Sequence, residues 1–208
     1  MSFDESINSI AVVIKEFRLR NDAERKWLDE NNEIGIVSIA VDESGLQKGA
    51  AIDLNAKTFP MVREGDLVTF DGQGHLLYGP KNPGAFLVYS MLFFECADDT
   101  RELGGFIEGV VGSEATNIGV KAMLAANPTL GAVLNAVTSL TSTISSRMTK
   151  AKSRELYRRN GTLLRDIRPP FDILRSYYSN NHWIGVTTSI IPLANSNMLG
   201  SQPKEMKL

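Results

Sequence analysis

The spacing of apolar residues changes twice along the chain, and this change constrains the fold more than any other feature. Between residues 33 and 97, short runs of β-branched and aromatic residues alternate with clusters of Gly, Pro, Asn and Asp. From about residue 99 to residue 149, apolar residues recur every three or four positions, as on a helix. Strand-like runs return after residue 153. This order predicts an α+β chain, a mostly antiparallel β-sandwich with a helical insertion over residues 99–149.

A chain of 208 residues, 43% of them hydrophobic, is long enough to bury a core as one domain. We expect a single β-sandwich domain over residues 1–195 and a loose C-terminal tail over residues 196–208. Cys96 is the only cysteine, which excludes an internal disulfide. No segment resembles a signal peptide or the about 18 apolar residues of a membrane span. The expected location is cytoplasmic, with export without a leader left open.

Two runs give the strongest strand predictions. Residues 33–41 are rich in Ile and Val, and residues 85–96 are apolar at nearly every position, as in a central strand covered on both sides. Residues 7–17 fit either a strand or a helix by their spacing, and their β-branched residues favour a strand. Later in the chain, Asn160-Gly161 predicts the two-residue turn of a β-hairpin.

The stretch from Asp71 to Gly84, DGQGHLLYGPKNPG, raises the question of a phosphate-binding loop. Such a loop leads into the N-terminus of a helix, whereas the glycines and prolines here prevent a helix from starting. Asp71-Gly72 instead predicts a hairpin turn between a strand over residues 61–70 and the apolar run His75–Tyr78. We therefore interpret this stretch as the turns of a β protein.

Three helices are predicted in the insertion. Asp99 and Glu102 have the spacing of a capping box before a helix over residues 103–111. Residues 114–126 form a second helical segment, and the third helix is predicted to begin at Asn127-Pro128. The apolar stripe of the third helix consists of Leu130, Val133, Leu134, Val137, Leu140, Ile144 and Met148.

Residues that commonly carry catalysis are few in this chain. It has two histidines, His75 and His182, and Cys96 follows an apolar strand, as a small buried residue would. None of the spacings G-x-S-x-G, H-E-x-x-H or C-x-x-C occurs. The sequence therefore nominates no catalytic residue.

Aspartates follow three of the predicted strands. If the strands alternate up and down, those over residues 33–41, 61–70 and 85–96 end at the same edge of the sheet. The residues just beyond these strands are Asp42, Asp71, Asp98 and Asp99. Calcium prefers about six to eight oxygen ligands, so these carboxylates are a candidate calcium site, and calcium is the one cofactor that the sequence suggests. As ordinary turn and cap residues, the same aspartates would need no metal.

Charge is divided unevenly along the chain. Residues 1–146 contain 11 Lys and Arg against 20 Asp and Glu, a net charge of −9, whereas residues 147–208 contain 11 against 4, a net charge of +7. The candidate partner-binding residues in the basic part are Arg147, Lys150, Lys152, Arg154, Arg158, Arg159, Arg165 and Arg168. A sequence pI of about 5.8 argues against nucleic acid as the partner. The alternative interpretation is a solvated surface of mixed sign.

Three hypotheses on function follow. The first is a non-catalytic interaction or assembly module that binds a protein partner or a second copy of itself. The second is a calcium-dependent β-sandwich domain that contacts an anionic membrane or a protein through the aspartates. The third is an enzyme with scattered active-site residues. We favour the first because catalytic motifs are lacking and the charge is split.

Overall fold

The computed structural model describes residues 3–20, 33–48, 52–96, 103–111 and 129–194. The strands in these ranges are β1 (Ser9–Leu19), β2 (Glu33–Asp42), β3 (Asp53–Phe59), β4 (Leu67–Thr69), β5 (His75–Lys81), β6 (Phe86–Cys96), β7 (Arg154–Leu164), β8 (Ser176–Asn180) and β9 (Ile184–Leu193). The helices are α1 (Glu43–Gln47), α2 (Leu103–Val111), α4 (Leu130–Lys150) and the 3-10 helix η2 (Pro170–Asp172). None of these helices is long and apolar enough to cross a membrane.

The strands form two antiparallel sheets. Sheet A has the order β4-β1-β9-β8, with β5 also paired to β1, and sheet B has the order β3-β2-β6-β7. The structure thus confirms the prediction of a mostly antiparallel α+β chain. The segment over residues 7–17, whose spacing fitted either a strand or a helix, lies largely in the strand β1, which agrees with its β-branched residues.

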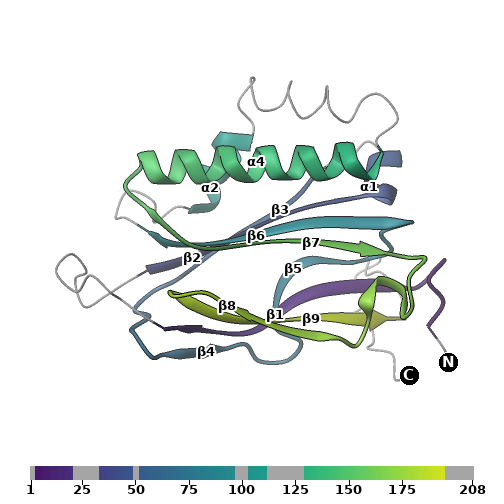
Figure 1. The fold of residues 1–208 in the computed structure, drawn as a ribbon, viewed down its shortest axis with the longest axis horizontal. Helices are drawn as coiled ribbons and strands as arrows, with labels where there is room; N and C mark the ends of the chain where they lie inside the picture. The colour runs from purple at the N-terminus through teal and green to yellow at the C-terminus, as the bar shows by residue number, and fades with distance from the viewer. Residues whose placement is uncertain (1–2, 21–32, 49–51, 97–102, 112–128, 195–208) are drawn as a thin grey trace.

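The two sheets lie as separate layers in Figure 1, and one cluster of buried side chains contains residues of both. Val12 of β1 belongs to this cluster together with Ile36 and Phe93 of sheet B. On the other face of sheet B, helices α2 and α4 cover a second cluster, in which Leu92 packs with Ile144. β6 is apolar at nearly every position because both of its faces are buried, as the sequence predicted.

Helix α4 presents most of the predicted apolar stripe to sheet B, but Leu134, which was predicted to belong to the stripe, lies on the exposed side. Leu134 is 38% exposed. The buried positions of the stripe are Val133, Val137, Leu140, Ile144 and Met148. The burial of this stripe explains why the helix forms here, since most helical stability in proteins comes from packing of the apolar face.

The predicted start of this helix was wrong. Thr129 is the N-cap, because its Oγ1 accepts a hydrogen bond from the backbone N–H of Ala132 at 3.3 Å. A threonine in this position satisfies one of the free N–H groups of the first turn, so a cap at Asn127 is not needed. The predicted capping box and the second helical segment, over residues 114–126, lie outside the described residues.

Residues 71–74 form a turn before the strand β5, but the predicted hairpin is wrong. β4 and β5 both pair with β1, one after the other along its edge, and not with each other. Between them, the backbone N–H of Phe70 donates to the carbonyl oxygen of Lys15 at 3.1 Å. Gly74, with a φ of +106°, then passes so close to the carbonyl oxygen of Ile14 that a side chain would collide with it.

The predicted hairpin turn at Asn160-Gly161 is also wrong, since both residues lie inside the continuous strand β7. Gly161 pairs with Tyr89 of β6, and a side chain at position 161 would overlap the ring of this tyrosine. The glycine therefore serves close packing against a buried ring, which a local sequence pattern cannot distinguish from a turn.

Candidate functional site

Asp42, the first predicted calcium ligand, already has both carboxylate oxygens occupied. It caps helix α1, since its Oδ1 accepts a hydrogen bond from the backbone N–H of Gly45 at 2.6 Å. Its Oδ2 lies 2.6 Å from Nζ of Lys81, and the side chain is only 2% exposed. The ammonium group of Lys81 thus supplies the positive charge for which a metal ion was expected.

Lys81 joins the two sheets through a second carboxylate. Its Nζ lies 2.6 Å from Oδ2 of Asp53 in β3 and 5.1 Å from the centre of the Tyr78 ring. Burial alone would lower the pKa of Lys81, but its hydrogen bonds to Asp42 and Asp53 outweigh this effect and raise the pKa. The side chain therefore stays an ammonium ion and cannot act as an amine nucleophile.

The register separates Asp71 from Asp42. Asp71 precedes β5, whereas Lys81 ends it, and a strand of this length spans roughly 20 Å. Asp98 and Asp99 lie outside the described residues. In the described ranges, no three His, Cys, Asp or Glu side chains lie close enough together to hold a metal ion.

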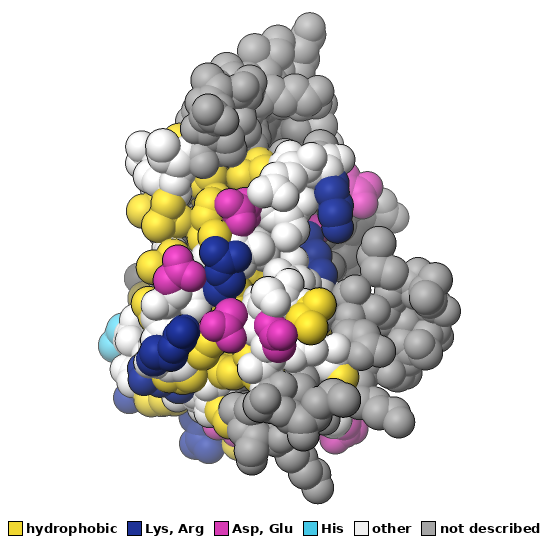
Figure 2. Space-filling model, turned by 90° about the vertical axis from the view of Figure 1, so that its right-hand side faces the viewer, with side chains coloured by type: hydrophobic (Ala, Val, Ile, Leu, Met, Phe, Trp, Pro, Cys, Tyr) yellow, Lys and Arg dark blue, Asp and Glu magenta, His cyan; other side chains and the backbone are white. Residues whose placement is uncertain are grey.

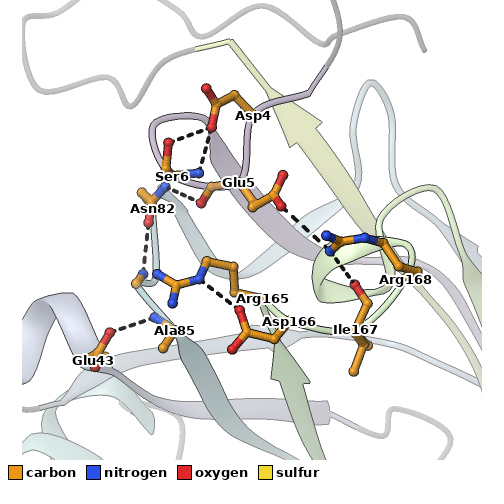
Figure 3. A network of polar contacts seen from close by, with 11 residues as sticks. Asp4, Glu5, Ser6, Glu43, Asn82, Ala85, Arg165, Asp166, Ile167 and Arg168 are labelled. Carbon is orange, nitrogen blue, oxygen red and sulfur yellow. Dashed lines mark hydrogen bonds and ion pairs between the residues drawn. The ribbon is translucent and has the colours of Figure 1, made fainter.

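The end of the molecule that contains Asp42 carries a network of local polar contacts (Figure 3). Glu43 accepts a hydrogen bond from the backbone N–H of Ala85 at 2.6 Å, and Nδ2 of Asn82 donates to the carbonyl oxygen of Glu5 at 3.2 Å. Arg168 reaches Glu5 at 3.6 Å. Figure 2 shows acidic and basic side chains interspersed on this end, so its described surface is not a patch of one sign.

The predicted partner-binding residues are spread over several elements. Arg147 and Lys150 lie in the last turn of α4, where positive charge is favoured by the helix dipole, and Lys152 follows it. Arg154 stacks on the ring of Trp183 at 4.0 Å, and Arg165 contacts Asp166 at 3.2 Å. The structure therefore does not bring the eight residues together in one surface.

Arg158 and Arg159 are neighbours in β7 but lie on its opposite faces. Arg158 contacts Glu155 at 2.7 Å and Ser142 of α4 at 3.2 Å. Arg159 points to sheet A, where its Nη1 donates to Ser179 Oγ of β8 at 2.9 Å. Two arginines that the sequence could only group together thus have different surroundings.

A polar cluster surrounds Arg159 where the edge strands β7 and β8 face each other (Figure 1). The hydroxyl groups of Tyr157 and Ser179 lie 2.6 Å apart, and Thr188 Oγ1 lies 3.5 Å from Nη1 of Arg159. The guanidinium lies 5.3 Å from the centre of the Tyr177 ring. The half-buried guanidinium therefore donates to two hydroxyl groups, those of Ser179 and Thr188, and lies near one aromatic ring, and all of these groups are neutral.

The backbone next to this cluster is strained. Phe171, Asp172 and Leu174 have φ values of +53°, +53° and +62°, which non-glycine residues rarely adopt. Phe171 is completely buried, and Asp172 pairs with Arg175 at 3.4 Å. Such conformations cost about 1–3 kcal/mol each and persist only where surrounding contacts fix them. The burial of Phe171, the ion pair of Asp172 and the hydrogen bond from the backbone N–H of Leu174 to the carbonyl oxygen of Ile190 hold this segment.

A groove lies on the outer face of sheet A, with a volume of about 230 Å³. The residues that line it are Glu16, Arg18, Leu67, Tyr178, Gly185 and Thr187. The register explains this grouping, because Arg18 pairs with Leu67 on one side and Gly185 on the other, and Thr187 pairs with Glu16 and Tyr178. The six residues thus form two adjacent rows across four strands.

The groove is open because its floor lacks a side chain. Tyr178 is 64% exposed and leans over Gly185, where an added Cβ atom would lie 2.6 Å from the tyrosine hydroxyl oxygen. Glu16 accepts a hydrogen bond from Thr187 at 3.1 Å, whereas no hydrogen bond or ion pair joins Arg18 to a described residue. The sequence analysis missed these residues, because only the pairing of four strands brings them together.

The chain matches no protein-family model, no curated protein and no solved structure.

Proposed function

We propose that the chain is a non-catalytic assembly module that binds a second copy of itself through the groove on sheet A. The observation that carries the proposal is the open groove beside an exposed tyrosine and an arginine without a described partner. Tyrosine and arginine are the residue types that often dominate binding energy at protein interfaces. Leu67, which is 44% exposed, adds apolar surface at the edge of the groove.

The charges of the groove suit a two-fold interface. Such an interface brings the same patch of both copies together, so the patch must be complementary to itself. Glu16 and Arg18 point out of the same face of β1 and are of opposite sign. In a two-fold arrangement, Arg18 of each copy faces Glu16 of the other. A partner of a single charge would leave one of these two groups unmatched.

The proposed module is one β-sandwich domain over residues 1–195, in which the helices of residues 99–149 are an insertion between β6 and β7. The buried cluster that contains residues of both sheets supports this arrangement. So does the chain order, in which α2 and α4 follow β6 and precede β7. The insertion covers the outer face of sheet B, which leaves the outer face of sheet A as the face that carries the groove.

The other hypotheses have less support. A calcium-dependent domain loses its main argument, because Asp42 is bound by Lys81 and is separated from Asp71 by the length of β5. An enzyme would need a nucleophile or a general base in a defined arrangement, and Lys81, which lies between Asp42 and Asp53, has a raised pKa that keeps it protonated.

Sedimentation velocity over a dilution series tests the proposal. We expect the wild-type chain to self-associate, with an apparent mass that falls on dilution. Tyr178→Ala should weaken association at least about tenfold, as expected for a residue at the centre of an interface. Gly185→Val should weaken it by filling the groove, while displacing only the exposed end of Tyr178.

Leu134→Ala is the matched control, since Leu134 is 38% exposed on α4 and lies on the other side of sheet B. It should leave association unchanged. A wild-type chain that stays monomeric at millimolar concentration would show the proposal to be wrong, as would equal effects of the three substitutions.

A further inference from the structure

We infer that Arg159 forms a binding site for an oxyanion, a carboxylate or phosphate group, at the edge between β7 and β8. This site is separate from the groove, since Arg159 and Ser179 lie on the inner side of the sheets and Tyr178 lies on the outer face. The oxyanion site can therefore be tested separately from self-association through the groove.

The first argument is that Arg159 is fixed in position but lacks a counter-charge. Its Nη1 is held by Ser179 at 2.9 Å and by Thr188 at 3.5 Å. Arg159 forms no ion pair with a carboxylate of the described residues, and Asp172, whose charge acts on the neighbouring Tyr89, pairs with Arg175. A half-buried charge without a partner is costly, and an anion from solution would offset that cost.

The second argument is the geometry of the free donors. An arginine has five N–H donors, and those on Nε and Nη2 form a fork that matches two oxygens of a carboxylate or phosphate. Among the N–H groups of Arg159, only those on Nη1 donate a hydrogen bond to a described residue. The hydroxyl groups of Ser179 and Thr188 therefore hold one end of the guanidinium and leave the fork available.

Neutral donors surround the same position. Tyr89 projects from the inner face of β6 next to Arg159, since it pairs with Gly161, two residues along β7. Burial raises the pKa of Tyr89, so its hydroxyl group stays protonated and can donate. The hydroxyl group of Tyr157 lies 2.6 Å from that of Ser179. A fixed guanidinium with hydroxyl donors beside it is the arrangement that recognises an oxyanion without a metal ion.

The test is a titration of the ¹⁵N-labelled full chain, followed by NMR at the Nε–H groups of arginine. Inorganic phosphate and acetate are added separately, against chloride at matched ionic strength, so that the two oxyanions can be told apart. We expect a saturable shift of the Arg159 Nε–H signal with at least one of them. A shift that does not saturate, or that chloride reproduces, would overturn the inference.

Arg158→Gln and Arg159→Gln form a matched pair, because they remove the same charge from adjacent positions of one strand. Anion binding, measured as a rise in Tm, should persist in Arg158→Gln and disappear in Arg159→Gln. Arg159→Lys keeps the charge but not the fork, so it should weaken binding about tenfold or more. Equal anion binding by Arg158→Gln and Arg159→Gln would also overturn the inference of an oxyanion site at Arg159. If one of the variants does not fold, the NMR titration of the wild-type chain is the test.

Discussion

At the scale of single residues, the absence of a side chain is as informative as its presence. Gly161 is required because the ring of Tyr89 lies against its backbone, and Tyr89 is only 2% exposed. Gly104 of α2, by contrast, has open space where a Cβ atom would be placed. Both glycines lie inside regular elements, so only their surroundings distinguish a structural requirement from an exchangeable position.

We therefore predict opposite effects of two identical substitutions. Gly161→Ala should lower the free energy of unfolding by about 1–3 kcal/mol, because the buried ring must shift to admit a methyl group. Gly104→Ala should raise it by up to about 1 kcal/mol, since alanine is the better helix former. Urea denaturation of the two variants and the wild type measures both values. Equal effects would mean that Tyr89 does not pack on Gly161 as described.

His75 is a second single residue with a testable effect, because it makes the free energy of unfolding depend on pH in the mildly acidic range. Burial, assisted by the charge of Lys57, lowers the pKa of His75 below its ordinary value of 6.5. Below pH 6.5 the unfolded chain binds a proton that the folded chain does not, so the free energy of unfolding falls until the folded pKa is reached. His75→Phe should remove this component and keep the ring packing on Phe59 and Phe70.

Urea denaturation at several pH values between 7.5 and about 5 checks the His75 prediction. The wild-type curve should fall more steeply than that of the variant on the acidic side of pH 6.5. Parallel curves for the two proteins would contradict it.

At the scale of elements, sequence patterns predicted the strands and the helix whose side chains are buried at regular spacing, but they did not predict which strands pair with each other. The strands β2 and β6 and the apolar stripe of α4 follow from residues buried at regular spacing. Both hairpin predictions failed, because β4 and β5 pair with β1, and Asn160-Gly161 continues a strand. The groove was missed for the same reason, since residues of distant strands form it, and Arg159 was predicted as a binding residue without the hydroxyl groups of β8 and β9 that hold it.

The packing of α4 on sheet B leads to a prediction with an internal control. Leu140 is 2% exposed and lies in the cluster between α4 and sheet B, whereas Leu134 is 38% exposed on the same helix. Leu140→Ala should lower the free energy of unfolding by about 2–5 kcal/mol, and Leu134→Ala by less than about 1 kcal/mol. Thermal or urea denaturation of both variants checks this, and similar losses would contradict the orientation of the helix.

The ion pair of Asp42 separates the calcium hypothesis from the structural one. Asp42→Asn should lower the free energy of unfolding by about 1–2 kcal/mol, less than for a fully buried pair, because Lys81 is 32% exposed and keeps Asp53. Denaturation in millimolar calcium and in EDTA should give the same loss. A loss seen only with calcium would instead show that Asp42 is a metal ligand.

At the scale of the whole molecule, the uneven charge of the sequence does not become one basic surface. The predicted partner-binding arginines and lysines lie on α4, on both faces of β7 and in the loop after it, and several already contact acidic side chains. Helices cover the outer face of sheet B (Figure 1), and the residues that line the groove lie on the outer face of sheet A. Assembly through the groove is thus the central claim about function.

Exchange of the charges of Glu16 and Arg18 tests assembly through the groove most directly. Self-association of the variants and the wild type is measured by sedimentation velocity at matched concentrations. Arg18→Glu and Glu16→Arg should each weaken self-association, because each places like charges opposite one another. The double variant should restore association, since every copy then again presents one acid and one base to its partner. Two single variants that associate like the wild type, or a double variant weaker than both, would contradict assembly through this groove.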